Sequence, residues 1–405
     1  MHVFVYAVAG LVARLAPLWL LSASLLGSGA WVSSSMLVLG THDNESFLEC
    51  THRYSAGISD DRVICPTQNL MGLVALVPDV FRSSALIASG VMLQIATTVL
   101  IYKYTTKNYK TILWRIYWLN PVIIIGGTNS FLLCLHHFLV VLLLTGVETT
   151  WTISAMISLT LLSSWFDFTY TGAVFIVCYS LTMPINYIPK DRKLGGILVS
   201  ILYASLFIVF VGFILIYYLR YNTSLVDGWY EQVYKSLSTP KPSQQYYRPS
   251  AGVLWYLEAL AFKSHQIYFH YFTLLQPMLF SLPLFVRFYG ILKNEIILIV
   301  TLMMVLFLRR SNNYVDIMLL LLLPLRTANV LTRMRFLPVI FFSVVTTAII
   351  SPLMLSLWIQ SGSGNANYLF FQGWVMCIFV ALYITEYLNT AVRMLLTDEG
   401  KDKDV

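Results

Sequence analysis

The chain is dominated by long, uninterrupted apolar runs, and this pattern restricts the fold more than any other feature. One run extends from Phe336 to Leu357 and another from Gly373 to Val392. As helices, runs of this length cross the roughly 30 Å hydrocarbon core of a membrane. A β-barrel would alternate apolar and polar residues instead. With 58% apolar and only 11% charged residues in 405, we predict an all-α polytopic membrane protein of about twelve transmembrane helices in a single domain, 1–405.

The positive charges collect in a few short segments between these runs. Because Lys and Arg concentrate in cytosolic loops, the net charge of +7 does not indicate nucleic-acid binding. The same rule predicts that both termini are cytosolic, including a charged tail at 393–405, and that segments 41–70, 220–266 and 359–368 are lumenal. Arg309-Arg310 breaks this pattern, because the predicted topology puts it near the lumen.

The first lumenal segment, 41–70, carries several features of a secreted environment. Asn44-Glu45-Ser46 is a glycosylation sequon, and Cys50 and Cys65 could form a disulfide there. In the second, 220–266, the stretch from Ser250 to Gln266 is predicted to be an amphipathic helix in the membrane interface.

No pattern in the chain predicts a catalytic residue, a metal ligand or a cofactor. Membrane glycosyltransferases that use dolichol-linked sugars carry acidic residues, usually Asp-x-Asp, in the first lumenal loop. That loop here has only the adjacent pair Asp60-Asp61 and isolated acids. There is no Gly-x-Ser-x-Gly nucleophile motif and no Cys-x-x-Cys pair.

Few ionisable residues fall inside the apolar runs, and Asp316 is the most informative. It is either a structural ion-pair partner of Arg309 or Arg310, or a functional carboxylate. His136 and His137 are adjacent, so we expect them to face different sides of a helix and to be packing or interfacial residues.

A polar hairpin separates the last two apolar runs. It contains Gly362, Ser363, Gly364, Asn365 and Asn367. Interfacial aromatic residues are predicted to surround it: Trp255, Tyr256, Trp358, Tyr368 and Trp374. Such a rim suits an amphiphile with a polar head, but an ordinary aromatic belt, or asparagines that only cap the flanking helices, would look the same.

Four motifs together resemble the phosphatidylinositol-glycan class U family, the multi-pass subunit of the glycosylphosphatidylinositol (GPI) transamidase. The hairpin from Leu357 to Tyr368 is similar to the family's Leu-Trp-Ile-x-x-Gly-Ser-x-Asn-x-Asn-Phe. Gly252-Val253-Leu254-Trp255-Tyr256 resembles Gly-Leu-Phe-Trp-Tyr, and Tyr117 to Pro121 resembles Tyr-Leu-Leu-Asn-Pro. Asp316 stands where the family has an Asp before an apolar run that ends in Pro, here Pro324.

The resemblance implies a non-catalytic subunit in the endoplasmic reticulum membrane that helps to bind and present the GPI lipid. It implies a fold like the membrane part of polytopic glycosyltransferases. The implied partners are a cysteine-protease-like catalytic subunit, a peptidase-like multi-pass subunit and lumenal single-span subunits. The GPI-binding or subunit-contact residues would be Trp255, Tyr256, Asp316, Trp358, Gly362, Ser363, Gly364, Asn365, Asn367 and Tyr368. The alternatives are a GPI-pathway mannosyltransferase and a pure membrane scaffold.

Overall fold

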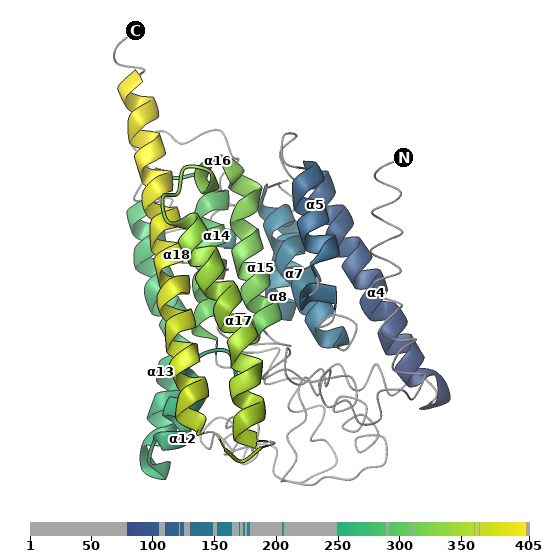
Figure 1. Cartoon of the computed structure of the whole chain (residues 1–405). Helices are drawn as coiled ribbons and strands as arrows, with labels where there is room; N and C mark the ends of the chain where they lie inside the picture. The colour runs from purple at the N-terminus through teal and green to yellow at the C-terminus, as the bar shows by residue number, and fades with distance from the viewer. Residues whose placement is uncertain are drawn as a thin grey trace.

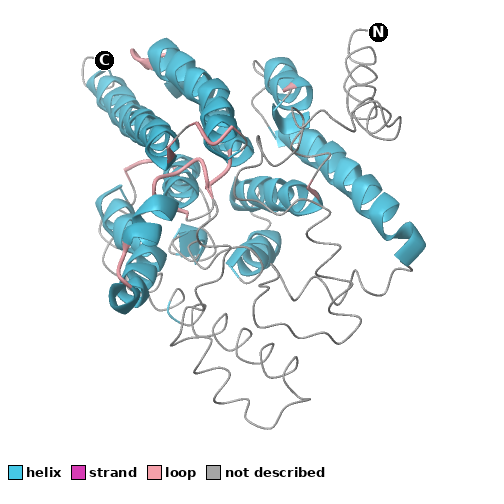
Figure 2. Cartoon of the chain, turned by 60° about the horizontal axis from the view of Figure 1, so that its bottom comes forward, coloured by secondary structure: helices cyan, strands magenta, loops and turns pink. Residues whose placement is uncertain are grey.

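A computed structural model describes the part of the chain that contains most of these motifs. The described residues are 79–104, 110–120, 122–124, 130–148, 152–163, 170, 173–174, 176–178, 205 and, with gaps at 289–290, 310–311, 360 and 364, residues 249–401. The predictions for the N-terminus, for segment 41–70 with Asn44, Cys50 and Cys65, for residues 220–248, and for Gly364 lie outside these residues. Every regular element within them is a helix (Figure 2).

The first described helices form a group on one side of the bundle (Figure 1). Helix α7 packs against both α4 and α8, and α5 packs against α4. At Gly146 of α7, an added Cβ atom would lie 2.9 Å from the Cβ of Ala155, so the missing side chain allows the close approach of α7 and α8. The helices are α4 (Asp79–Tyr104), α5 (Lys110–Leu119), α7 (Phe131–Glu148) and α8 (Thr152–Leu161).

The second group contains the remaining helices, with α17 and α18 packed along one another. The helices are α12 (Leu254–Leu260), α13 (Lys263–Phe288), α14 (Asn294–Leu308), α15 (Tyr314–Leu322), the 3₁₀ helix η6 (Leu323–Thr327), α16 (Ala328–Leu331), α17 (Leu337–Ile359) and α18 (Ala366–Lys401). Helix α12 and the α17–α18 hairpin lie at the lower end in Figure 1, which we call the hairpin end, and α16 lies at the opposite end.

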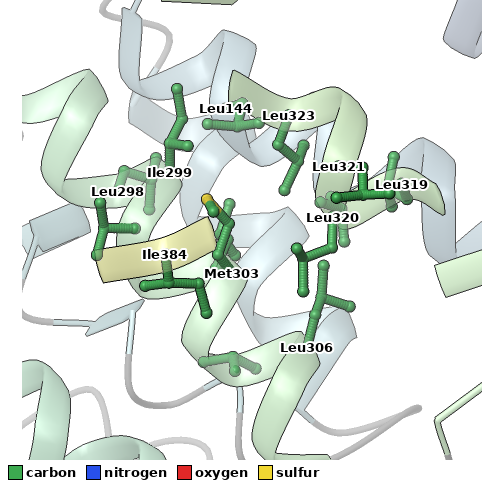
Figure 3. Close-up of a cluster of buried hydrophobic side chains, with 14 of the residues drawn as sticks. Leu144, Leu298, Ile299, Met303, Leu306, Leu319, Leu320, Leu321, Leu323 and Ile384 are labelled. Carbon is green, nitrogen blue, oxygen red and sulfur yellow. The ribbon is translucent and has the colours of Figure 1, made fainter. Parts of the chain in front are cut away.

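Helix α14 is the centre of the hydrophobic core. It packs against α7, α13, α15 and α18, and Leu298, Ile299 and Met303 along it are completely buried. Figure 3 shows these side chains beside Leu306 of the same helix and beside Leu319 of α15 and Ile384 of α18. A helix that is apolar on all sides can be stable only in such a position or within a membrane, so the sequence of α14 fits its place.

Among the residues that the structure describes, three helices are long and apolar enough to cross a membrane, over Ala85–Lys103, Leu337–Trp358 and Ala366–Leu396. Their outer faces carry large exposed apolar side chains such as Phe342 and Ile378. Large exposed apolar surfaces of this kind are typical of contact with lipid or with another protein. The described part of the chain is therefore an all-helical membrane protein, as predicted.

Two predicted segments are divided differently in the structure. The amphipathic helix expected from Ser250 to Gln266 is only the seven-residue α12, and α13 begins three residues after it ends. The second is the apolar run at 314–330, which as a single span would be one helix but is divided into α15, η6 and α16. Pro324 explains this second division, because it has no N–H to continue the hydrogen bonds of α15.

Candidate functional site

The hairpin between α17 and α18 is shaped by one glycine and one asparagine. Gly362 has a φ of 61°, a left-handed conformation that glycine adopts without steric cost. Asn365 precedes α18, and its side-chain oxygen accepts a hydrogen bond from the backbone N–H of Asn367 at 3.2 Å. This is the contact of a helix-capping residue, so Asn365 caps α18.

Asn367 instead reaches across to the Trp255-Tyr256 motif. The hydroxyl of Tyr256 donates a hydrogen bond to the side-chain oxygen of Asn367. The Tyr256 ring also stacks on Phe370, with ring centroids 4.3 Å apart. A second stacked pair is Trp255 with Trp358, at 6.2 Å. We call these four rings, Trp255, Tyr256, Trp358 and Phe370, the aromatic corner.

Polar and aromatic groups are exposed together beside this corner. Asn365 and Asn367 are exposed, as are Gly362 and Ser363. Next to them on α18, the side chains of Tyr368, Phe371 and Trp374 are 59%, 62% and 45% exposed. The hairpin end therefore presents amide and hydroxyl groups at the border of an apolar aromatic surface.

The segment before α12 is held against two other elements by close backbone contacts. A Cβ atom added to Gly373 would lie 2.9 Å from the carbonyl oxygen of Gly252, so α18 can approach this segment only with glycine at 373. The backbone N–H of Ala251 donates to the carbonyl of Asn312 at 2.8 Å. These contacts place the α14–α15 connection about two helical turns from the hairpin, in the half of the bundle nearer the hairpin end.

Asp316 belongs to a different site, a buried polar cluster within the bundle. It lies in the first turn of α15 and is 1% exposed. The side chain of Asn313 accepts a hydrogen bond from the backbone N–H of Asp316 at 2.6 Å and donates to its Oδ2 at 2.7 Å. Arg309 donates to the same oxygen at 3.2 Å. Of the two ion-pair partners predicted, Arg309 is therefore confirmed, while Arg310 lies outside the described residues.

The two histidines of α7 correct the prediction that they face different sides of the helix. Both approach one carboxylate oxygen: His136 Nδ1 is 2.9 Å from Asp316 Oδ1, and His137 Nε2 is 3.4 Å from it. Adjacent helical residues are about 100° apart around the axis, and long imidazole side chains span that angle when the target lies between them. Tyr117 and Tyr170 complete the cluster, and all seven of its side chains, including those of Asn313 and Arg309, are buried.

Arg309 also explains the exception to the charge pattern. Its side chain is only 8% exposed and is paired with Asp316, rather than facing water as a cytosolic arginine would. A buried, paired arginine does not act as a topology signal. Arg309, in the half of the bundle nearer the hairpin end, is thus compatible with the predicted arrangement of the helices.

The structure thus assembles part of the predicted site and separates the rest. Trp255, Tyr256, Trp358 and Asn367 come together, whereas Asp316 lies in the buried polar cluster. Sequence analysis missed Phe370 and the joint role of the two histidines. The histidines could have been found from their position alone, because polar residues inside an apolar run are costly unless they have partners.

The chain was also compared with known proteins. A search of curated proteins gives no match. The family model described as GPI transamidase subunit PIG-U matches residues 54–376. This match covers most of the chain and includes α7, the buried polar cluster, the aromatic corner and the hairpin. The chain therefore belongs to the PIG-U family of GPI transamidase subunits.

Proposed function

We propose that the chain is a non-catalytic subunit of the GPI transamidase that binds the GPI lipid at the hairpin end and holds it for transfer to a proprotein. The observation that supports this role is the exposure of Asn365 and Asn367 directly beside the aromatic surface of Tyr368, Phe371 and Trp374. GPI has both a glycan and phosphate head, which amides and hydroxyls can bind, and acyl chains, which aromatic and apolar side chains can contact.

The arrangement of hydrogen bonds gives the two asparagines different parts in this proposal. Asn367 Oδ1 accepts from Tyr256, which leaves its side-chain NH₂ group directed as a donor, and amide donors suit phosphate or sugar oxygens. The side-chain oxygen of Asn365 accepts the hydrogen bond that caps α18, and its NH₂ group remains a donor. We propose that both NH₂ groups bind the head of the lipid and that the aromatic corner holds Asn367 in place.

Binding alone is a sufficient role for such a subunit. Holding the GPI amine beside an acyl-enzyme on another chain raises its effective concentration without any acid, base or nucleophile. We place the reaction in the endoplasmic reticulum, with the hairpin end in the lumen, and we infer the remaining partners from the family: a cysteine-protease-like catalytic subunit, a peptidase-like multi-pass subunit and lumenal single-span subunits. The proposal keeps about twelve spans and the glycosyltransferase-like fold for the whole chain.

Transfer of GPI by complexes with altered hairpin residues tests the proposal. Asn367→Ala removes the proposed lipid donor, and we expect GPI transfer to fall about tenfold, the cost of one hydrogen bond to a charged group. Tyr256→Phe is the matched control, because it breaks the same Tyr256–Asn367 bond but keeps the amide. It should reduce transfer less than Asn367→Ala does.

The cap of α18 needs a separate control. Asn365→Ser keeps a side-chain oxygen that caps helices well but removes the amide donor. We expect this variant to assemble normally and to transfer GPI more slowly. If Asn365→Ser and Asn367→Ala both assemble and transfer at the normal rate, the lipid-binding role is wrong. The subunit would then be better described as a membrane scaffold, or as a mannosyltransferase if neutralising Asp60 and Asp61 abolishes activity.

A further inference from the structure

Three potential metal ligands converge inside the buried polar cluster. They are Nδ1 of His136, Nε2 of His137 and Oδ1 of Asp316, and all three atoms lie within 4.8 Å of one another. The two distances to the carboxylate oxygen are 2.9 and 3.4 Å. Ligand atoms about 2.0–2.2 Å from a tetrahedral zinc ion are about 3.3 Å apart. Two of the three ligand spacings are therefore close to those of a metal site.

The other nitrogen of each histidine is held by a tyrosine. His136 Nε2 is hydrogen bonded to the hydroxyl of Tyr170, and His137 Nδ1 lies 3.3 Å from the hydroxyl of Tyr117. Metal-binding histidines almost always direct their second N–H to an oxygen in this way, which fixes the tautomer and the ring orientation. In the neutral tautomer that carries its proton on the nitrogen near the tyrosine, each ring donates to that hydroxyl. Its other nitrogen then has a lone pair that can bind a metal ion.

The third ligand has an equally well-defined environment. Asn313 and Arg309 both bind Oδ2 of Asp316, so Oδ1 is the oxygen that faces the two histidines. His137 Nε2 is fully buried and makes no hydrogen bond within the described residues, although it lies 3.4 Å from that oxygen. At 3.4 Å this contact is too long to be a strong hydrogen bond, and a buried nitrogen with only a weak partner is costly. A metal ion between these atoms would remove that cost.

We propose that His136, His137 and Asp316 bind one divalent first-row metal ion, with zinc as the first choice. Imidazole and carboxylate ligands suit zinc, and two histidines with one carboxylate leave a fourth position for water. The ion would join α7 to α15 across 180 residues of sequence. This site does not depend on the lipid-binding role, and none of its three ligands belongs to the aromatic corner.

The charge of Arg309 gives a prediction about the affinity of the site for a metal ion. Its guanidinium is 3.2 Å from Asp316 Oδ2 and repels a cation at the site. Arg309→Gln should therefore increase the affinity for the metal ion. If the cluster were only an ion-pair network, the same substitution would lower stability and create no affinity for metal.

Metal analysis of the purified transamidase complex tests the site. We expect the wild-type complex to contain about one more zinc ion than a complex with His136→Gln and His137→Gln, which lacks two of the ligands. His265→Gln is the matched control, because His265 is exposed, and it should leave the metal content unchanged. Tyr117→Phe and Tyr170→Phe should each weaken binding about 10–100-fold.

A second measurement needs no variant and covers the case in which the histidine variants do not assemble. The wild-type complex is treated with a chelator and then titrated with Co²⁺ alone. We expect visible absorption bands from a Co²⁺ ion bound by nitrogen and oxygen, and a rise in the thermal unfolding temperature when Zn²⁺ is restored. No Co²⁺ bands, together with no effect of chelation or Zn²⁺ on unfolding, would overturn the proposal.

Discussion

Single residues decide where the helices of the core end. Pro324 stops α15, because it cannot donate to the carbonyl groups of the preceding turn. The hydroxyl of Tyr383, on α18, donates to one of those carbonyls, that of Leu321, at 2.9 Å. Both residues are buried, so water does not replace this bond. Tyr383 thus satisfies a backbone group at the break between α15 and η6.

This contact gives a prediction at the residue scale. Tyr383→Phe removes only the hydroxyl, and we expect the complex to lose about 1 kcal/mol of stability, the usual value for a buried hydrogen bond. Thermal unfolding of the purified complex measures the change. Tyr268→Phe makes the same substitution at a side chain that is 72% exposed and should have no effect. Equal unfolding temperatures for both variants would contradict the role given to Tyr383.

A glycine without a side chain allows α18 to pack closely against the segment before α12. The approach of α18 to the segment before α12 depends on Gly373, whose position opposite the Gly252 carbonyl leaves no room for a Cβ atom. The same approach brings Asn367 to Tyr256 and Phe370 into the aromatic corner. The geometry of the hairpin end therefore depends on the Gly373–Gly252 contact, which lies more than one helical turn from the hairpin itself.

Enlarging Gly373 should disturb this pair of elements. We expect Gly373→Val to destabilise the complex by about 1–3 kcal/mol, the range found for overpacked sites, and to lower GPI transfer by displacing Asn367. Ala381→Val, on the exposed face of the same helix, is the control and should change neither quantity. Normal unfolding and normal transfer by Gly373→Val would show that the close contact is not needed.

The whole molecule has two ends that we expect to face different compartments. Helix α17 has 23 residues and therefore a length of about 35 Å, enough to cross a membrane. The hairpin lies at one end of it and α16 at the other (Figure 1). The exposed apolar faces between the ends, for example Phe342 and Ile349, fit a lipid environment.

Labelling of single cysteines in sealed microsomes tests this orientation. Cys50, Cys65 and Cys377 are replaced by Ser, and Cys134 and Cys178 stay because they are buried. In this background we expect Asn329→Cys in α16 to react with an impermeant maleimide from outside. Ser361→Cys in the hairpin should react only after the membrane is opened. Both positions are exposed in the structure, so the maleimide should distinguish them only by the side of the membrane on which each lies. Reaction of Ser361→Cys in intact vesicles would reverse the predicted topology.

The helical class, the approximate positions of α17 and α18 and the resemblance to the PIG-U family could be predicted from the sequence. Helix formation in a membrane depends on the hydrophobicity of each local segment, and the Arg309–Asp316 pair is separated by only seven residues. The same reasoning named Trp255, Tyr256, Trp358 and Asn367 as neighbours of one surface. It treated His136 and His137 as packing residues, because each was considered only within its own helix.

Tertiary structure alone decided the long-range partners. Tyr256 and Asn367 are 111 residues apart, and His136 and Asp316 are 180 residues apart. No periodicity in the sequence links such positions, because they meet only when α7, α14, α15 and α18 pack around a common core. The sequence by itself thus determined that this is a helical membrane subunit of the PIG-U type. Packing decided that its polar residues form two sites, one exposed at the hairpin end and one buried between α7 and α15.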